Sequence, residues 1–206
     1  TDQASATADI DAKTLTVSLA NSGTTKTYDT TTYAPVGFTP DFAVSGLIDG
    51  DSSAALTYSS AVYNDKDEAD ANIVTVSGIT LGAITGTNSS VAGDYVLASS
   101  VATTPASITK APLSVTANDD AKFVTQSYVS GYAGVTYSGF VGSEGASTAG
   151  VLGGSLSIAR SDSSNDLAGE YALTPSGITA FFRRYALFQY RFYSSSSCPL
   201  YNDKRL

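Results

Sequence analysis

Alternating hydrophobic and polar positions run through most of the chain with the period of two that β-strands require. In "KTLTVSLAN" (13–21), Leu15, Val17 and Leu19 fall on one face, and threonine and serine fall on the other. Similar but shorter segments are "NIVTVSGITL", "GDYVLASS" and "GSLSIARS". Turn clusters rich in Gly, Asn, Asp and Ser separate these segments, and no amphipathic helical stripe accompanies them. The pattern predicts an all-β fold made of antiparallel β-sandwich-like modules.

The chain also matches itself. "ADIDAKTLTV" (8–17) returns as "ASITKAPLSV" (106–115), "SGLIDGD" (45–51) as "SGFVGSE" (138–144), and "AGDYVL" (92–97) as "AGEYAL" (168–173). Internal repeats of this kind indicate tandem modules. We therefore expect an elongated pair of β-modules set end to end. Their predicted bounds, with those of the tail that follows, are 1–104, 105–180 and 181–206.

Charge is unevenly distributed along the 206 residues. Only 15% of residues are charged, and the formal net charge is −8. Residues 1–180 carry −12 and residues 181–206 carry +4, which together give that −8. An acidic body repels phosphate backbones and anionic lipid, so nucleic-acid binding is not expected. No run of 18 apolar residues is present, so no membrane span is expected either.

Residue types that support catalysis are scarce. The chain has no His and a single Cys, Cys198, so the commonest general base, the commonest metal ligand and any internal disulfide are missing. Paired carboxylates can hydrolyse glycosides, but no pair stands out among the 19 acidic residues. We therefore expect no enzymatic activity and no resident cofactor, calcium being the one exception to consider.

At its repeated residues the chain resembles a known group of proteins. The segments "KTYDTTTYAP", "FAVSGLIDGD", "YNDKDEADANIVTVSGITL" and "DYVLASS" resemble the YDG domain of large bacterial haemagglutinin- and adhesin-like exoproteins. "ITKAPLSVTANDDAK", "YSGFVGSEG" and "AGEYALTPSGI" resemble the MBG repeat that commonly follows it. The resemblance covers about residues 8–180. It implies an all-β fold, a secreted or cell-surface location, and a stalk or spacer role in adhesion and biofilm, with no enzymatic activity.

Two departures from the family pattern stand out. The naming motif has Gly after Tyr-Asp, whereas Thr30 follows Tyr28 and Asp29 here, which implies a different turn or local strain. MBG repeats close their sheet with an Asn-Tyr strand and a Gly-Thr-Leu strand, but here "AFFRRYALFQYRFY" follows Thr179. The second module therefore lacks its own last strands or builds them from this unusual sequence.

A metal site is considered first at the acidic run of "YNDKDEADAN". Closely spaced oxygen ligands suit Ca²⁺, but the run lacks the glycine and closing glutamate of an EF-hand loop, and a solvated loop is the favoured interpretation. The candidate ligands are Asp65, Asp67, Glu68 and Asp70. The acids Asp49, Asp51, Asp119 and Asp120 are interpreted as turn formers with a weaker claim to calcium. Exposed tyrosines can stack on sugars, whereas Tyr95 and Tyr171, inside apolar runs, are expected in the core.

The aromatic, basic tail admits three interpretations. It completes the second module's sheet within its own chain, it is donated to the next molecule and builds a filament, or it is an accident of reading frame or fusion. Its alternation favours a strand. The candidate assembly residues are Tyr185, Leu187, Phe188, Tyr190 and Phe192.

These features predict a structural module of a secreted bacterial surface adhesin, acting as a stalk or as a self-assembling filament subunit. The alternative is a carbohydrate- or calcium-binding adhesive module. The expected partners are copies of the chain or neighbouring repeats of a longer protein, and in the alternative a surface glycan.

Overall fold

The computed structural model describes residues 8–121, 132–163, 167–181, 184–190 and 192–193. The chain forms two compact units. The first contains the described residues up to Lys26 and Thr31–Thr109. The second contains Thr27–Thr30 and the described residues from Lys110 onward. The predicted boundary after Thr104 falls inside a strand that runs on to Thr109, because Thr104 and Ile108 are both buried there.

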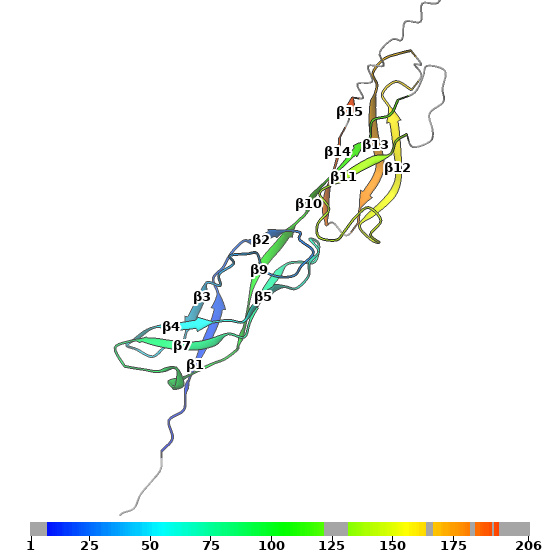
Figure 1. Cartoon of the computed structure of the whole chain (residues 1–206). Coiled ribbons are helices and arrows are strands. Elements are labelled where there is room, and N and C mark those ends of the chain that lie inside the picture. Colours follow the sequence, from blue (N-terminus) through cyan, green and yellow to red (C-terminus); the bar gives the residue numbers. More distant parts are fainter. Residues whose placement is uncertain (1–7, 122–131, 164–166, 182–183, 191, 194–206) are drawn as a thin grey trace, which may run out of the picture. The chain divides into compact units, whose positions relative to one another are not determined.

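The first unit is built from three sheets (Figure 1). Their strand orders are β3-β1-β8, β2-β9-β6-β5 and β4-β7. The elements are β1 (Lys13–Leu19), β2 (Thr24–Thr27), β3 (Phe42–Ser45), β4 (Asp51–Thr57), β5 (Ser60–Tyr63), β6 (Ile73–Ser77), β7 (Thr80–Gly86), the 3-10 turn η1 (Ala92–Asp94), β8 (Tyr95–Leu97) and β9 (Val101–Thr109).

The second unit has two sheets, with strand orders β11-β10-β14 and β12-β13-β15. Its strands are β10 (Ala111–Ala117), β11 (Val135–Ser138), β12 (Leu152–Arg160), β13 (Ala172–Ala180), β14 (Tyr185–Tyr190) and β15 (Phe192–Tyr193). The all-β expectation is confirmed, and the described residues contain no helix with the length and apolar character needed to span a membrane.

The two units repeat one three-stranded sheet. In the first, β1 pairs antiparallel with β3 and parallel with β8. In the second, β10 pairs antiparallel with β11 and parallel with β14. The registers correspond, since Thr16 faces Ser45 just as Ser114 faces Ser138. Each unit therefore departs from a purely antiparallel sheet at the strand that returns beside its first strand, β8 in the first unit and β14 in the second.

The strand pairing corrects the internal repeat predicted from the sequence at one segment. Tyr95 begins β8 and faces Lys13, and Tyr185 begins β14 and faces Ala111. The structural counterpart of "YVL" (95–97) is thus "YAL" (185–187). The "AGEYAL" segment instead leads into β13, which pairs with β12 and β15. The short sequence similarity between these two segments did not identify the structural counterpart, because strand pairing depends on contacts between residues distant in sequence.

Each unit has a small core of its own. In the first unit, Leu15, Val74 and Val76 are fully buried. In the second, Leu113 and Val151 are fully buried. The inward positions of β10 alternate with exposed or half-buried ones, so this strand has the two-residue period that the sequence predicts.

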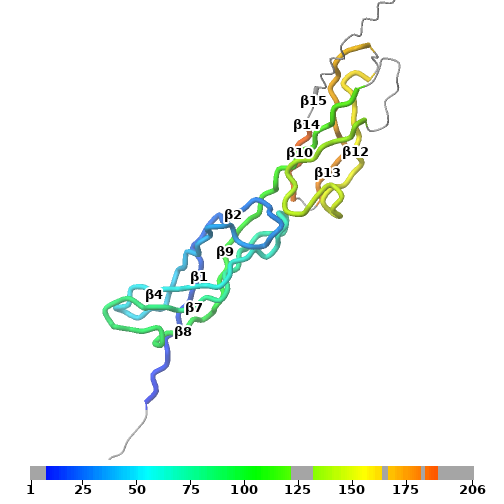
Figure 2. The backbone as a smooth tube through the Cα atoms, viewed as in Figure 1, coloured from blue at the N-terminus to red at the C-terminus, as the bar shows by residue number. Residues whose placement is uncertain are grey.

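The aromatic tail supplies strands to its own chain. β14 pairs with β10 over six residue pairs, from Ala111–Tyr185 to Thr116–Tyr190, and Figure 2 shows the two strands side by side. β15 adds two pairs to β13. Of the two placements considered for the strand, the structure has the one within its own chain, and an origin of the tail by reading-frame or fusion accident is compatible with it. Cys198 lies outside the described residues.

Thr30 keeps the backbone conformation that glycine favours. Its φ is 71°, in the left-handed region, where β-branched residues are rare. Of the two consequences expected from replacing the motif's glycine, the structure therefore has local strain.

Removing the tail should unfold the second unit, because Leu113 and its neighbours on β10 would lose the strand that covers one edge. We expect a chain ending at Ala180 to lose amide protection across residues 111–117 in hydrogen–deuterium exchange. A chain ending at Tyr193 retains β14 and β15 and is the control. Equal protection in the two chains would contradict the assignment.

Candidate functional site

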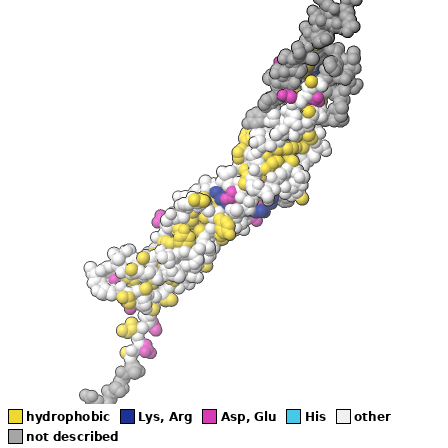
Figure 3. All heavy atoms as spheres, viewed as in Figure 1, with side chains coloured by type: hydrophobic (Ala, Val, Ile, Leu, Met, Phe, Trp, Pro, Cys, Tyr) yellow, Lys and Arg dark blue, Asp and Glu magenta, His cyan; other side chains and the backbone are white. Residues whose placement is uncertain are grey.

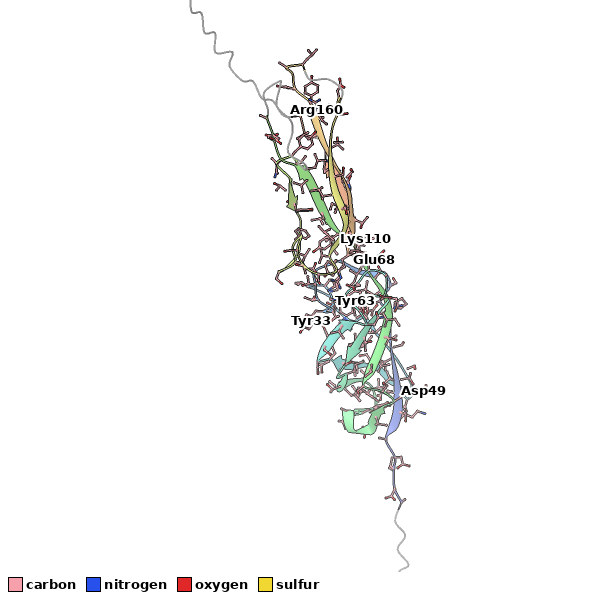
Figure 4. The ribbon with its side chains drawn as sticks, turned by 90° about the vertical axis from the view of Figure 1, so that its right-hand side faces the viewer. Tyr33, Asp49, Tyr63, Glu68, Lys110 and Arg160 are labelled. Carbon is pink, nitrogen blue, oxygen red and sulfur yellow. The ribbon has the colours of Figure 1, made fainter. Side chains whose placement is uncertain are left out.

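A tyrosine–carboxylate clamp closes the first unit. Tyr95, at the start of β8, is 5% exposed. Its hydroxyl donates a hydrogen bond to Asp51 Oδ2 and accepts one from the Ile48 backbone N–H at 3.2 Å. Ile48 lies in the loop between β3 and β4, which Asp49 marks in Figure 4, and Asp51 is the first residue of β4. Because the phenol is satisfied on both sides, it can be buried without a lost hydrogen bond.

The same clamp closes the second unit. The Tyr185 hydroxyl donates to Glu144 Oε2 and accepts from the Val141 backbone N–H at 3.0 Å. Val141 and Glu144 stand three residues apart, as Ile48 and Asp51 do. We call these two arrangements the Tyr95 clamp and the Tyr185 clamp.

Glycine places each clamp loop against the first strand. Gly46 has φ 101° and Gly139 has φ 109°, a conformation that L side chains rarely adopt. A Cβ at Gly46 would meet the carbonyl oxygen of Thr14, and one at Gly139 would meet that of Pro112. The glycine of the "SG" that begins both repeated segments is therefore needed so that the loop backbone can lie close to the first strand, and not only to form a turn.

The Tyr185 clamp carries two further donors. Tyr28 donates its hydroxyl hydrogen to Glu144 Oε1 at 2.8 Å, and an Arg184 guanidinium N–H donates to the same oxygen at 3.2 Å. The rings of Tyr28 and Tyr185 pack edge to face with centroids 5.7 Å apart. Phe140 packs against Tyr185 in the same way at 5.8 Å. The Glu144 side chain is 12% exposed and that of Arg184 is 14% exposed, so this ion pair is largely shielded from water.

The clamp environments shift the pKa values of their groups. Burial, and next the hydrogen bond to Glu144, raise the pKa of Tyr185 to about 12. The same two causes raise the pKa of Tyr28 further. In the first unit, burial and the bond to Asp51 raise the pKa of Tyr95, and the Tyr95 hydroxyl lowers that of Asp51. All three phenols are therefore neutral donors at neutral pH.

Chemically, the clamps hold strands in place. Both oxygens of Glu144 already accept hydrogen bonds from the donors around it, so its position suits an acceptor that fixes structure. The sites fix the start of β8 and of β14 against the loop that follows the neighbouring strand.

The acidic run predicted as a calcium site forms the loop between β5 and β6, where Figure 4 labels Glu68. The Asp67 backbone N–H donates to Asp65 Oδ1 at 2.8 Å, and Asn64 Nδ2 donates to the carbonyl oxygen of Asp70. Within the described part of the chain, which includes all four candidate ligands, no group of three His, Cys, Asp or Glu side chains could hold a metal ion.

The remaining residues predicted as calcium or assembly sites lie in different parts of the structure. Asp51 belongs to the Tyr95 clamp, and Asp120 accepts a hydrogen bond from the neighbouring Ala121 N–H, as a turn former does. Among the assembly candidates, Tyr185 is buried and Phe188 is 47% exposed. Leu187, Tyr190 and Phe192 lie in β14 and β15.

The tyrosines expected in the core differ from one another. Tyr95 is buried in its clamp. Tyr171 is half-buried, donates to the Leu167 carbonyl oxygen at 3.0 Å and lies under the Arg160 guanidinium at 4.6 Å.

Sequence reasoning missed Tyr28, Glu144 and Arg184. One signal was available for Glu144, because the match of "SGLIDGD" with "SGFVGSE" places an acid three residues after Ile48 and again after Val141. No local pattern marks the tyrosine that each acid binds, because 44 residues separate Tyr95 from Asp51 and 41 separate Tyr185 from Glu144.

Replacing Glu144 with glutamine should weaken the second unit. Glu144→Gln keeps the shape but puts an amide donor opposite Tyr28, Tyr185 or Arg184, so we expect a loss of about 1–3 kcal/mol in the free energy of unfolding. Urea denaturation measures it. Glu170→Gln, on an exposed side chain, is the matched control and should stay within about 0.5 kcal/mol of the parent chain.

The Tyr185 clamp should also make the chain sensitive to alkali. Because the folded pKa of about 12 lies above the ordinary 10.0, the clamp's stabilisation is fully present below pH 10 and is lost as pH rises through 12. Calorimetric Tm should fall across this interval, and Tyr185→Phe should make the fall shallower. Tyr137→Phe removes the hydroxyl of a tyrosine in β11, paired with Val115 of β10, and should leave the slope unchanged.

Comparison with known proteins assigns the first part of the chain. No curated protein and no solved structure matches the chain. Residues 11–106 match the YDG domain, which covers the strands from β1 to most of β9 and contains the Tyr95 clamp. The chain therefore carries a YDG domain at residues 11–106.

Proposed function

We propose that the chain is a structural segment of a secreted bacterial surface adhesin and serves as a stalk that sets the distance between the cell and an adhesive region. The observation that carries this proposal is the repetition of one sheet and one clamp in two successive units. In both units, the hydrogen-bonded tyrosine and carboxylate of the clamp hold strands together.

Other features support a spacer role in place of a catalytic one. The chain has no His, and the carboxylates of the two clamps are hydrogen-bonded to tyrosine. Charged side chains are sparse on the face shown in Figure 3, in keeping with a Thr- and Ser-rich chain that is only 15% charged. A stalk needs a stable sheet and a solvated surface more than it needs a binding pocket.

The second unit extends the proposal to the adhesin context. We assign it the role of an MBG-like repeat whose missing closing strands are replaced by β14 and β15. Because these strands pair within the chain, a single chain suffices as a stalk segment, and a filament would require β14 to leave β10.

A replacement experiment in the source bacterium tests this function. Deleting residues 8–193 in frame should leave the adhesin on the cell surface but reduce attachment, since the adhesive region would lie closer to the cell. Inserting two unrelated β-domains of similar length should restore attachment, because a spacer acts by length. Adhesion assays with surface immunolabelling measure both.

Failure of the unrelated spacer to restore attachment would contradict the stalk function. Inhibition of attachment by the purified chain, or its retention on a polysaccharide column, would do the same and would favour a glycan-binding module. A Tm that rises with added Ca²⁺ would favour the calcium-binding form of that alternative.

A further inference from the structure

The first and last long strands of the second unit lie next to each other and point the same way. β10 begins this unit's continuous segment, and β14 is the last strand of more than two residues within the part of the chain that the structure describes. Their six pairs run from Ala111–Tyr185 to Thr116–Tyr190 in parallel register. Parallel neighbours need a long crossover between them, so nearly the whole unit lies between these two strands in sequence.

This arrangement determines how tension acts on the pair. A pull from the N-terminal side acts on β10 at Ala111, and a pull from the C-terminal side acts on β14 at Tyr190. In parallel strands these points lie at opposite ends of the pair. The two forces therefore slide the strands past one another along their length, and all the hydrogen bonds between them carry load together. If the pull acted at one end only, the bonds would break one after another.

We propose that the parallel β10–β14 pair is the force-bearing element of the second unit, loaded in shear when the chain is stretched from its ends. This inference deepens the stalk function proposed above and rests on it for its biological purpose. The geometry itself comes from the strand register alone.

The Tyr185 clamp lies where sliding must begin. Tyr185 is the first residue of β14, and its hydroxyl binds Val141 N–H and Glu144 in the loop after β11. Immediately before it, the Arg184 carbonyl oxygen accepts the Ala111 N–H at 2.9 Å, while the Arg184 side chain binds Glu144. Moving β14 toward its C-terminus by one residue would break these bonds together with the strand ladder.

The C-terminal side adds little resistance beyond β14. β15 is held to β13 by only two pairs, Ala172–Tyr193 and Leu173–Phe192. Tension from the C-terminus should therefore release β15 first and then reach the six pairs of β14. We accordingly assign the main mechanical barrier to β14.

Single-molecule force spectroscopy on the full chain tests this inference by changing the pulling direction. One protein is held through residues 1 and 206, and the other through an Asp119→Cys attachment and residue 206, with Cys198→Ser in both. Asp119 is exposed and lies just after β10, so the second geometry pulls on the C-terminal ends of both strands and peels them apart. Opening the second unit from its ends should lengthen the chain by about 280 Å, against about 330 Å for the first unit.

We expect the rupture force of the second unit to be at least about twofold higher when the chain is pulled from its ends, because many weak bonds then break together. Tyr185→Phe should lower that force about 1.5-fold by removing the clamp hydrogen bonds. Tyr137→Phe, on the neighbouring strand, is the matched control and should leave the force unchanged.

Equal rupture forces in the two directions, or no effect of Tyr185→Phe, would overturn the inference. Such a result would leave the stalk function intact if the unrelated spacer still restored attachment. A strong directional difference with no restoration would instead keep the force-bearing pair and reject the stalk.

Discussion

The structure depends on one constraint, the return of a late strand of each unit to a place beside the first strand of that unit. A parallel neighbour cannot be reached by a tight hairpin, so the chain must leave the sheet, build a second one and come back. Both units do this: β8 returns to β1, and β14 returns to β10. The clamps follow from the same constraint, because the returning strand begins with a tyrosine and an acid stands six residues after the end of the antiparallel neighbour.

The two clamps show how a repeat can be reinforced without changing its plan. In the first unit the acid is aspartate, with Tyr95 as the tyrosine donor. In the second the acid is glutamate, one methylene longer, and it also accepts hydrogen bonds from Tyr28 and Arg184. Removing one donor from a carboxylate that is shielded from water is costly, because water does not replace the lost partner. The Glu144 side chain is 12% exposed, so the second unit depends on all three donors at this position.

Much of the fold could be predicted from local patterns. Alternation in "KTLTVSLAN" indicates β1, and the "SG…D/E" match indicates the repeated loop, because both signals lie within a few residues of each other. The site could not be found in this way. The tyrosine of each clamp meets its acid only after the chain has crossed between sheets, and the "AGEYAL" segment offered a closer match of letters than the true counterpart at Tyr185. The tail remained open between three interpretations because its strand character does not say which sheet it joins.

The strained turn at Thr30 has a consequence for how this region can change in evolution. Thr30 occupies a conformation suited to glycine, and Gly142 lies so close that a Cβ there would approach Thr30 Oγ1 to 3.3 Å. The bare backbone at 142 thus leaves room for a side chain at 30. A side chain at position 142 is disfavoured twice, by the φ of 61° at that residue and by its approach to Thr30. Restoring glycine at position 30 would remove only the second of these obstacles, so position 142 should remain glycine while position 30 varies.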